Sequence, residues 1–219
     1  MKLLDIAFKA RYEHNAIQKH EELAGFLALI ADLEPLKIIV EVGAFYGGTL
    51  WAWQQLGGVR VIGVDLPPEG YPDGPQVNDL GMTVILGDSH VQGTVDQLLE
   101  ALAGEPIDVL FIDGDHTYEG VKADYELYSP LVRPGGVIGF HDICTHPTMP
   151  FIEVDKFWMS LVGDKEEILT PPYTWGGIGV IHAEAPDDAV ANRAATLAGY
   201  RKAQDRIYHD PTSTFQRAR

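Results

Sequence analysis

The chain has 219 residues, of which 46% are hydrophobic and 22% charged, values typical of a single folded globular domain. Sixteen basic and 32 acidic residues give a formal net charge of -16, which disfavours nucleic acid and anionic membrane surfaces as partners. The single cysteine, Cys144, excludes an intrachain disulfide. Because the sequence has neither an apolar leader nor a run of about 18 apolar residues, we expect a cytoplasmic protein.

Helical and extended patterns alternate along most of the chain. Residues 1–35 show apolar side chains at helical spacing, and Pro35 ends this helical segment. Short apolar runs predict strands over residues 37–42, 59–64, 82–86, 107–112 and 137–140. Helices are expected between and after them, over residues 49–56, 91–102, 118–132 and 151–162.

The last third of the chain adds peripheral elements. Two later strands, over residues 166–169 and 177–182, are expected to form a hairpin at a sheet edge. Residues 67–80 are rich in Pro, Gly and Asp and predict a long loop, and residues 189–200 predict a peripheral helix. We therefore expect one α/β domain over residues 1–219, with its core at 37–182 and a peripheral segment at 184–219. Its sheet should be open and mostly parallel, with an antiparallel edge hairpin and helices on both faces.

Acidic residues lie at or just after the ends of nearly all the predicted strands. They are Glu41, Asp65, Asp88, Asp113 and Asp142. In open α/β sheets, ligands bind at the carboxyl ends of the strands. A single acid at such a position is often only a turn residue. Their repetition at the same end of the sheet predicts that these side chains converge on one crevice.

A glycine-rich loop follows the first predicted strand, from Glu41 to Gly48. Gly43 permits a sharp turn there, and Gly47 and Gly48 would let the backbone approach a ligand closely. The spacing is Gly-x-x-x-Gly, which differs from the Gly-x-Gly-x-x-Gly of dinucleotide-binding proteins. Asp65 lies 22 residues after Gly43, where an acid can accept both hydroxyls of a ribose.

Four motifs together resemble those of class I S-adenosylmethionine-dependent methyltransferases. They are Glu41 to Gly48, Val61 to Asp65, Leu86 to Ser89, and Phe111 to Gly120 taken with Leu131 to Asp142. The fourth is similar to a divergent group that includes macrocin-type and other sugar or antibiotic O-methyltransferases. The resemblance implies a Rossmann-like sheet and S-adenosylmethionine as cofactor. It implies cofactor contacts at Glu41, Gly43, Ala44, Phe45, Tyr46, Gly47, Asp65, Leu66, Asp88, Ser89 and Asp113.

Many members of this superfamily also bind a divalent metal through three ligands, and the resemblance implies where they lie here. The acid after the fourth strand corresponds to Asp113, with Asp115 as a competing ligand. The adjacent pair after the fifth strand corresponds to His141 and Asp142, and His141 departs from the acid or amide usual in relatives. Oxygen ligands suit Mg²⁺, whereas added imidazoles favour Mn²⁺, Fe²⁺ or Zn²⁺.

The nearby histidines leave two mechanisms open. With a metal, His116 and His146 could add further ligands to the site. Without one, His116 or His141 could remove the proton from the acceptor, because histidine titrates near neutral pH.

The expected activity is O-methylation of a small hydroxylated molecule, such as a sugar, an antibiotic or a catechol-like compound. Two other classes of protein remain as alternatives, a nicotinamide-dependent oxidoreductase and a non-catalytic nucleoside-binding module. The N-terminal helices could form a contact within a homo-oligomer.

Overall fold

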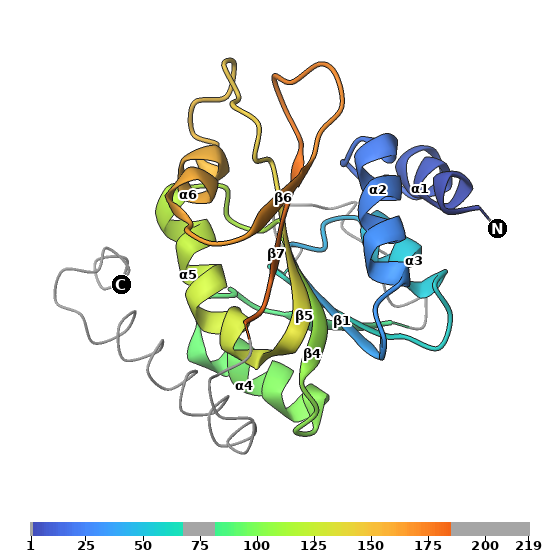
Figure 1. Cartoon of the computed structure of the whole chain (residues 1–219). Coiled ribbons are helices and arrows are strands. Elements are labelled where there is room, and N and C mark those ends of the chain that lie inside the picture. Colours follow the sequence, from blue (N-terminus) through green and yellow to red (C-terminus); the bar gives the residue numbers. More distant parts are fainter. Residues whose placement is uncertain (1, 68–81, 185–219) are drawn as a thin grey trace, which may run out of the picture.

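A single mixed sheet lies at the centre of the computed structural model, which describes residues 2–67 and 82–184. Within these residues the strand order is β3-β2-β1-β4-β5-β7-β6 (Figure 1). The strands are β1 (Ile38–Val42), β2 (Arg60–Asp65), β3 (Thr83–Leu86), β4 (Ile107–Ile112), β5 (Val132–His141), β6 (Lys165–Ile168) and β7 (Ile178–His182). Strands β1 to β5 pair in parallel, and β7 runs antiparallel to both β5 and β6. The predicted parallel sheet with an antiparallel edge hairpin is thus confirmed.

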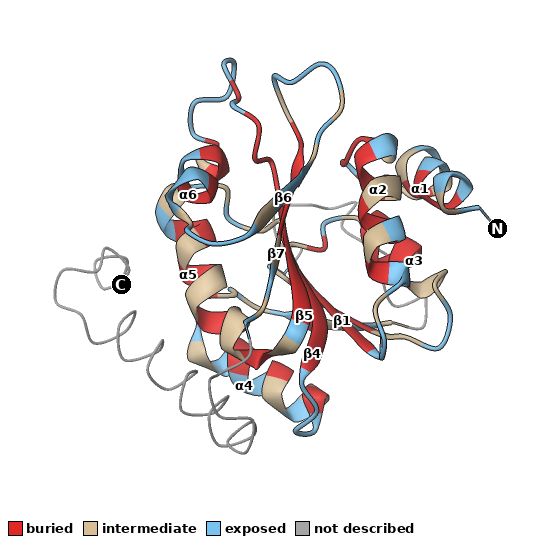
Figure 2. Ribbon diagram, viewed as in Figure 1, coloured by how far each residue is buried: buried red, intermediate tan, exposed pale blue. Residues whose placement is uncertain are grey.

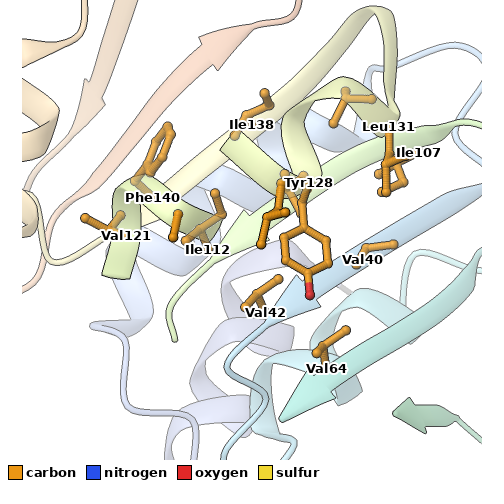
Figure 3. Close-up of a cluster of buried hydrophobic side chains, with 14 of the residues drawn as sticks. Val40, Val42, Val64, Ile107, Ile112, Val121, Tyr128, Leu131, Ile138 and Phe140 are labelled. Atoms are coloured by element: carbon orange, nitrogen blue, oxygen red, sulfur yellow. The ribbon is translucent and has the colours of Figure 1, made fainter. Parts of the chain in front are cut away.

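Helices cover both faces of the sheet (Figure 1). One face carries α1 (Leu3–Tyr12), α2 (His20–Ala31) and α3 (Gly48–Gln54), and the other carries α4 (Gln92–Leu102), α5 (Tyr118–Tyr128) and α6 (Val154–Ser160). Side chains alternate along β1, so that Val40 and Val42 join one buried cluster and Ile39 joins the other. Figure 2 shows the central strands buried between the two helical layers, and Figure 3 shows the cluster on the α5 face.

The N-terminal region forms two helices and not one continuous segment. Residues 13–19 separate α1 from α2, and Asn15 within them has a φ of +62°. The Arg11 guanidinium donates to the carbonyl oxygens of Ala16 and Ile17, each at 2.8 Å, and so holds this connection in place. The position of the break was not predicted, and the connection carries Gln18 toward the carboxyl ends of the strands.

Helix α5 and strand β5 meet earlier in the chain than expected. The helix was predicted to run to Val132, but α5 ends at Tyr128 and a short 3-10 helix covers Ser129–Leu131. Pro130 explains this end, because a proline has no backbone N–H with which to continue the α-helical hydrogen bonds. Strand β5 then begins at Val132 and pairs with β4 through a register shift between Ile107 and Val109.

Two predicted segments lie outside the described residues. They are the loop expected over residues 67–80, apart from Pro67, and the helix expected over residues 189–200. Within residues 2–67 and 82–184, no helix has the length and apolar character needed to cross a membrane.

Candidate active site

A cavity of about 710 Å³ opens at the carboxyl ends of the parallel strands. This volume falls in the range of small-molecule binding sites. The expected site residues that line it are Gly43, Ala44, Phe45, Tyr46, Asp65, Leu66, Asp88, Ser89, Asp113, Asp115, His116, His141 and Asp142. The segment from Asn15 to Gln18 forms a further part of the wall. The predicted convergence of strand-end residues on one crevice is therefore present in the fold.

Asp65 fastens the glycine-rich loop to the end of β2. Its Oδ2 atom accepts a hydrogen bond of 2.5 Å from the Phe45 backbone N–H, and its Oδ1 atom accepts one of 2.6 Å from the Leu66 N–H. Burial raises the pKa of Asp65 above its ordinary value, although these hydrogen bonds oppose the shift. A carboxylate can accept about four hydrogen bonds, so this one retains acceptor capacity toward the cavity.

Two glycines of the loop make room for other parts of the protein. Gly43 has a φ of +89°, and a Cβ atom there would lie 2.0 Å from the carbonyl oxygen of Asp113. A Cβ atom on Gly48 would lie 2.3 Å from the backbone nitrogen of Ala16. At Gly48 the N-terminal segment makes such a close approach, and Gly48 also lines the cavity. Gly47 has a φ of +74° and precedes α3, without lining the cavity.

Glu41 supports the glycine-rich loop through contacts with α3, on the face of the sheet that α3 covers. The side chain is fully buried and does not line the cavity. Its carboxyl group accepts hydrogen bonds from the Thr49 hydroxyl and, at 2.7 Å, from the Trp53 indole N–H. Burial raises the pKa of Glu41 to about 8, and these two donors oppose the shift. Glu41 therefore supports the loop through Thr49 and Trp53 and does not reach the cavity, where a cofactor contact was predicted for it.

The loop after β3 is held by residues that the sequence did not single out. Ser89 accepts a hydrogen bond of 2.6 Å from the Tyr128 hydroxyl through its carbonyl oxygen. His90 forms an ion pair of 3.1 Å with the fully buried Asp124. Asp124 and Tyr128 are four residues apart on the buried face of α5. Two polar side chains at that spacing on an otherwise apolar face were the sequence signal from which these contacts could have been predicted.

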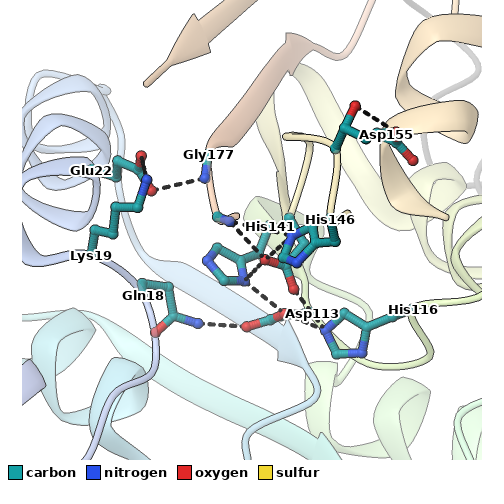
Figure 4. Close-up of polar contacts among 12 residues, drawn as sticks. Gln18, Lys19, Glu22, Asp113, His116, His141, His146, Asp155 and Gly177 are labelled. Atoms are coloured by element: carbon teal, nitrogen blue, oxygen red, sulfur yellow. Dashed lines mark hydrogen bonds and ion pairs between the residues drawn. The ribbon is translucent and has the colours of Figure 1, made fainter. Parts of the chain in front are cut away.

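Two carboxylates and three imidazoles meet at the ends of β4 and β5 (Figure 4). Asp113 Oδ1 lies 3.1 Å from His141 Nδ1 and 3.2 Å from His116 Nε2. Asp142 Oδ2 lies 3.2 Å from the same His116 nitrogen, and Asp142 Oδ1 lies 3.1 Å from His146 Nε2. His116 thus bridges the two carboxylates. We call Asp113, His116, His141, Asp142 and His146 the Asp–His cluster.

Opposite charges hold the Asp–His cluster together. Burial alone would lower the pKa of His116, but hydrogen bonds and charge from Asp113 and Asp142 raise it to about 10. The same two carboxylates raise the pKa of His141 to about 9 against the effect of burial. In turn, the histidines hold the pKa of both aspartates below the usual range, although burial opposes this. Both histidines are therefore protonated at neutral pH in this state, and an imidazolium can donate a proton but cannot accept one.

The cluster has the donor set of a divalent metal site. Asp113, His141 and Asp142 each offer one ligand atom, and these atoms lie within 4.8 Å of one another. Adjacent carboxylates favour a bound cation or a shared proton. Two nearby buried nitrogens, His141 Nε2 and His146 Nδ1, have no hydrogen-bond partner within the described residues. The residues present therefore fit a divalent cation.

Asp115, the competing ligand, is exposed and stands apart from this group. Its Oδ1 atom accepts a hydrogen bond of 2.8 Å from the Thr117 backbone N–H at the start of α5. Gln18, in contrast, was not predicted, and it contacts the cluster directly. Its side-chain N–H donates to Asp113 Oδ2 at 2.5 Å across 95 residues of sequence. No local pattern around Gln18 signals this contact.

Comparison with known proteins agrees with the fold and the motifs. Residues 40–143 match a family described as a methyltransferase domain. An uncharacterised protein of Acanthamoeba polyphaga mimivirus is 31% identical over 150 residues, which are 64% of this chain and 66% of that protein. Demethylmacrocin O-methyltransferase of Streptomyces fradiae is 24% identical over 149 residues, which are 65% of this chain and 33% of that enzyme.

Solved structures share the fold at low sequence identity. MycE, a methyltransferase of the mycinamycin pathway in complex with Mg, S-adenosylhomocysteine and mycinamycin VI, superposes with a TM-score of 0.58 at 15% identity. The match covers 86% of this chain and 56% of MycE. An O-methyltransferase from Bacillus cereus in complex with S-adenosylhomocysteine gives a TM-score of 0.56 at 22% identity, over 82% of this chain and 88% of that one.

The sheet order, the glycine-rich loop and the strand-end acids define a Rossmann-like methyltransferase fold. With the match over residues 40–143, they identify this part of the chain as a class I S-adenosylmethionine-dependent methyltransferase domain. Its relatives there include the macrocin-type O-methyltransferases. The chain spans about two thirds of the mimivirus relative and one third of the demethylmacrocin enzyme.

Proposed function

We propose that the protein transfers a methyl group from S-adenosylmethionine to a hydroxyl oxygen of a small molecule. One observation carries this proposal: a single cavity is lined both by the glycine-rich loop with Asp65 and by the Asp–His cluster apart from His146. The first part suits a nucleoside cofactor, and the second suits an acidic hydroxyl group. A methyl donor and its acceptor would therefore meet in one cavity, where positioning supplies much of the rate enhancement.

The loops after β1, β2 and β3 would hold the cofactor. The backbone from Gly43 to Tyr46 would face its methionine part, and the remaining acceptor capacity of Asp65 would take the ribose hydroxyls. Asp88 and Ser89 also line the cavity and would face the adenine. The cofactor supplies an electrophilic methyl group on a sulfonium.

The reaction balances with the groups in the cavity. The acceptor oxygen forms a bond to the methyl carbon as the carbon–sulfur bond breaks, leaving S-adenosylhomocysteine and a methyl ether. The hydroxyl proton must leave the oxygen during this transfer. His116 is about one third exposed and contacts both Asp113 and Asp142, so in its neutral form it is placed to accept this proton. A cation held by the two carboxylates would favour that neutral form, because it would offset the negative charge that raises the pKa of His116.

Asp113, His141 and Asp142 would hold a divalent cation beside the acceptor. Such a cation lowers the pKa of a hydroxyl group that it contacts and orients that group. The Mg in the MycE complex supports this part of the proposal. We infer that the acceptor is a small metabolite and that nucleic acid is not a partner, because the net charge of -16 repels phosphate backbones.

Calorimetry tests this proposal against its rivals. We expect S-adenosylhomocysteine to bind and NAD not to bind, because the loop lacks the dinucleotide spacing. Binding of NAD alone would instead favour the oxidoreductase. Transfer of labelled methyl from S-adenosylmethionine to members of a panel of sugars, antibiotics and catechols would establish catalysis. Cofactor binding without transfer to any acceptor would leave the nucleoside-binding module as the better description.

A further inference from the structure

Gln18 reaches the Asp–His cluster from outside the region matched to the methyltransferase family. It lies between α1 and α2, whereas the match covers residues 40–143. The side chain is only 3% exposed, and its Nε2 atom donates to Asp113 Oδ2 at 2.5 Å (Figure 4). Its Oε1 atom is buried and has no hydrogen-bond partner within the described residues. Gln18 thus donates its amide N–H to a candidate metal ligand, while its own amide oxygen stays without a hydrogen-bond donor within the described residues.

The backbone on the C-terminal side of Gln18 is held by a buried ion pair. Lys19 Nζ lies 3.2 Å from Glu22 Oε1 and donates to the carbonyl oxygens of Thr170 and Pro172, each at 2.7 Å. Glu22 is fully buried and accepts from the Gly177 backbone N–H at 2.8 Å. These contacts fasten the start of α2 to the β6–β7 connection, which fixes the place from which Gln18 extends.

The same connection also serves the second carboxylate. The backbone N–H of Gly176, next to the anchored Gly177, donates to Asp142 Oδ1 at 3.2 Å. Each carboxylate of the cluster therefore receives an N–H from an element that the Lys19–Glu22 pair holds. For Asp113 this donor is a side chain, so its contribution can be tested by substitution.

The amide of Gln18 selects which oxygen of Asp113 faces the histidines. With Oδ2 engaged by Gln18, Oδ1 is the atom that contacts His116 and His141. The terminal torsion of an aspartate is soft, so a carboxylate without this partner could rotate away. We propose that Gln18 is a positioning residue that orients Asp113 for cation binding. This inference rests on the proposed function, because it takes Asp113 to be a metal ligand.

Substitution of Gln18 by Met gives a sharp test, because Met has a similar length and lacks the N–H donor. Loss of the hydrogen bond that orients a metal ligand typically weakens metal affinity 10- to 100-fold. We expect about this loss for Mn²⁺, measured in the Gln18→Met protein from the electron paramagnetic resonance signal of free Mn²⁺. The melting temperature and the calorimetric affinity for S-adenosylhomocysteine should stay close to those of the wild type.

Gln97→Met is the matched control, since Gln97 is exposed on α4 and donates to the Gly93 carbonyl oxygen of its own helix. It should bind Mn²⁺ as the wild type does. Unchanged Mn²⁺ affinity in Gln18→Met would overturn the positioning role. A parallel fall in melting temperature and in both affinities would also overturn it, by showing a merely structural role. If the wild type bound S-adenosylhomocysteine but no Mn²⁺, the inference would fail while the methyltransferase assignment stood.

Discussion

Gly43 lies directly against Asp113, so that a Cβ atom on Gly43 would come within 2.0 Å of the Asp113 carbonyl oxygen. The glycine-rich loop and the end of β4 are therefore built as one unit. The glycine serves this packing as much as any ligand, because its φ of +89° is also one that other residues avoid.

Gly43→Ala should consequently destabilise the fold itself. We expect the free energy of unfolding to fall by at least about 3 kcal/mol, since a backbone clash is added to the strain of a positive φ. Gly57→Ala is the control, because Gly57 has a similar φ of +76° but open space around it. It should cost only about 1–2 kcal/mol. If urea unfolding showed that both variants lose the same free energy of unfolding, the contact of Gly43 with Asp113 would not contribute to stability.

Asp65→Ala should weaken cofactor binding. A hydrogen bond to a charged group contributes about 1.5–3 kcal/mol, which corresponds to roughly a ten- to hundredfold loss in affinity for S-adenosylhomocysteine. Calorimetry on Asp65→Ala and on Asp96→Ala, an exposed acid of α4, measures the effect. The Asp96 variant should match the wild type. If Asp65→Ala melted early but its folded fraction bound normally, the carboxylate would be a structural cap for Phe45 and Leu66.

Methyl transfer should require a divalent cation bound by Asp142. Asp142 has a φ of +64°, which Asn tolerates better than Ala, so Asp142→Asn removes the charge with little backbone strain. Chelator-treated wild type should lose activity and regain it on addition of metal. Mn²⁺ should bind more tightly than Mg²⁺, because His141 supplies an imidazole ligand. Asp142→Asn should not recover.

Asp115→Asn keeps the side-chain acceptor for the Thr117 N–H and tests the competing ligand. It should retain the metal affinity of the wild type. Full activity in the chelator-treated wild type would reject the metal and favour a histidine base. Loss of metal affinity in Asp115→Asn would show that this carboxylate belongs to the site.

Glu41 should make the fold less stable as the pH rises. Its pKa is about 8 in the folded protein against an ordinary value of 4.5, so the folded state retains a proton that the unfolded state releases between these values. Stability should therefore fall as the pH rises through this window, by at most about 1.4 kcal/mol per pH unit.

Glu41→Gln removes this titration and can keep both contacts. The amide oxygen can accept from the Trp53 indole, and the Thr49 hydroxyl can accept from the amide N–H. Denaturant unfolding of both proteins at intervals from pH 5 to pH 8 should show the variant gaining stability relative to the wild type. Parallel pH profiles would mean that Glu41 is ionised in the folded protein throughout.

The order of strands and helices and the family motifs could be predicted from the sequence because they depend on short-range patterns. Apolar runs predicted β1 to β5 near their observed places, and the acids after them predicted the edge where the site lies. Parallel pairing then made convergence of Asp113 and Asp142 a consequence of topology. The end of α5 was missed by four residues, although Pro130 gave a local signal for it.

Only the tertiary structure decided how these residues are used. It turned Glu41 into the α3 face, brought Ala16 against Gly48, and separated Asp115 from the Asp–His cluster. It also brought Gln18 to Asp113 across 95 residues of sequence. The ion pair between Lys19 and Glu22 fixes the backbone next to Gln18. Periodicity and spacing describe the chain over a few turns, whereas such contacts depend on how distant elements pack. A single polar side chain such as Gln18, in an irregular connection between two helices, belongs to no sequence pattern that predicts its partner.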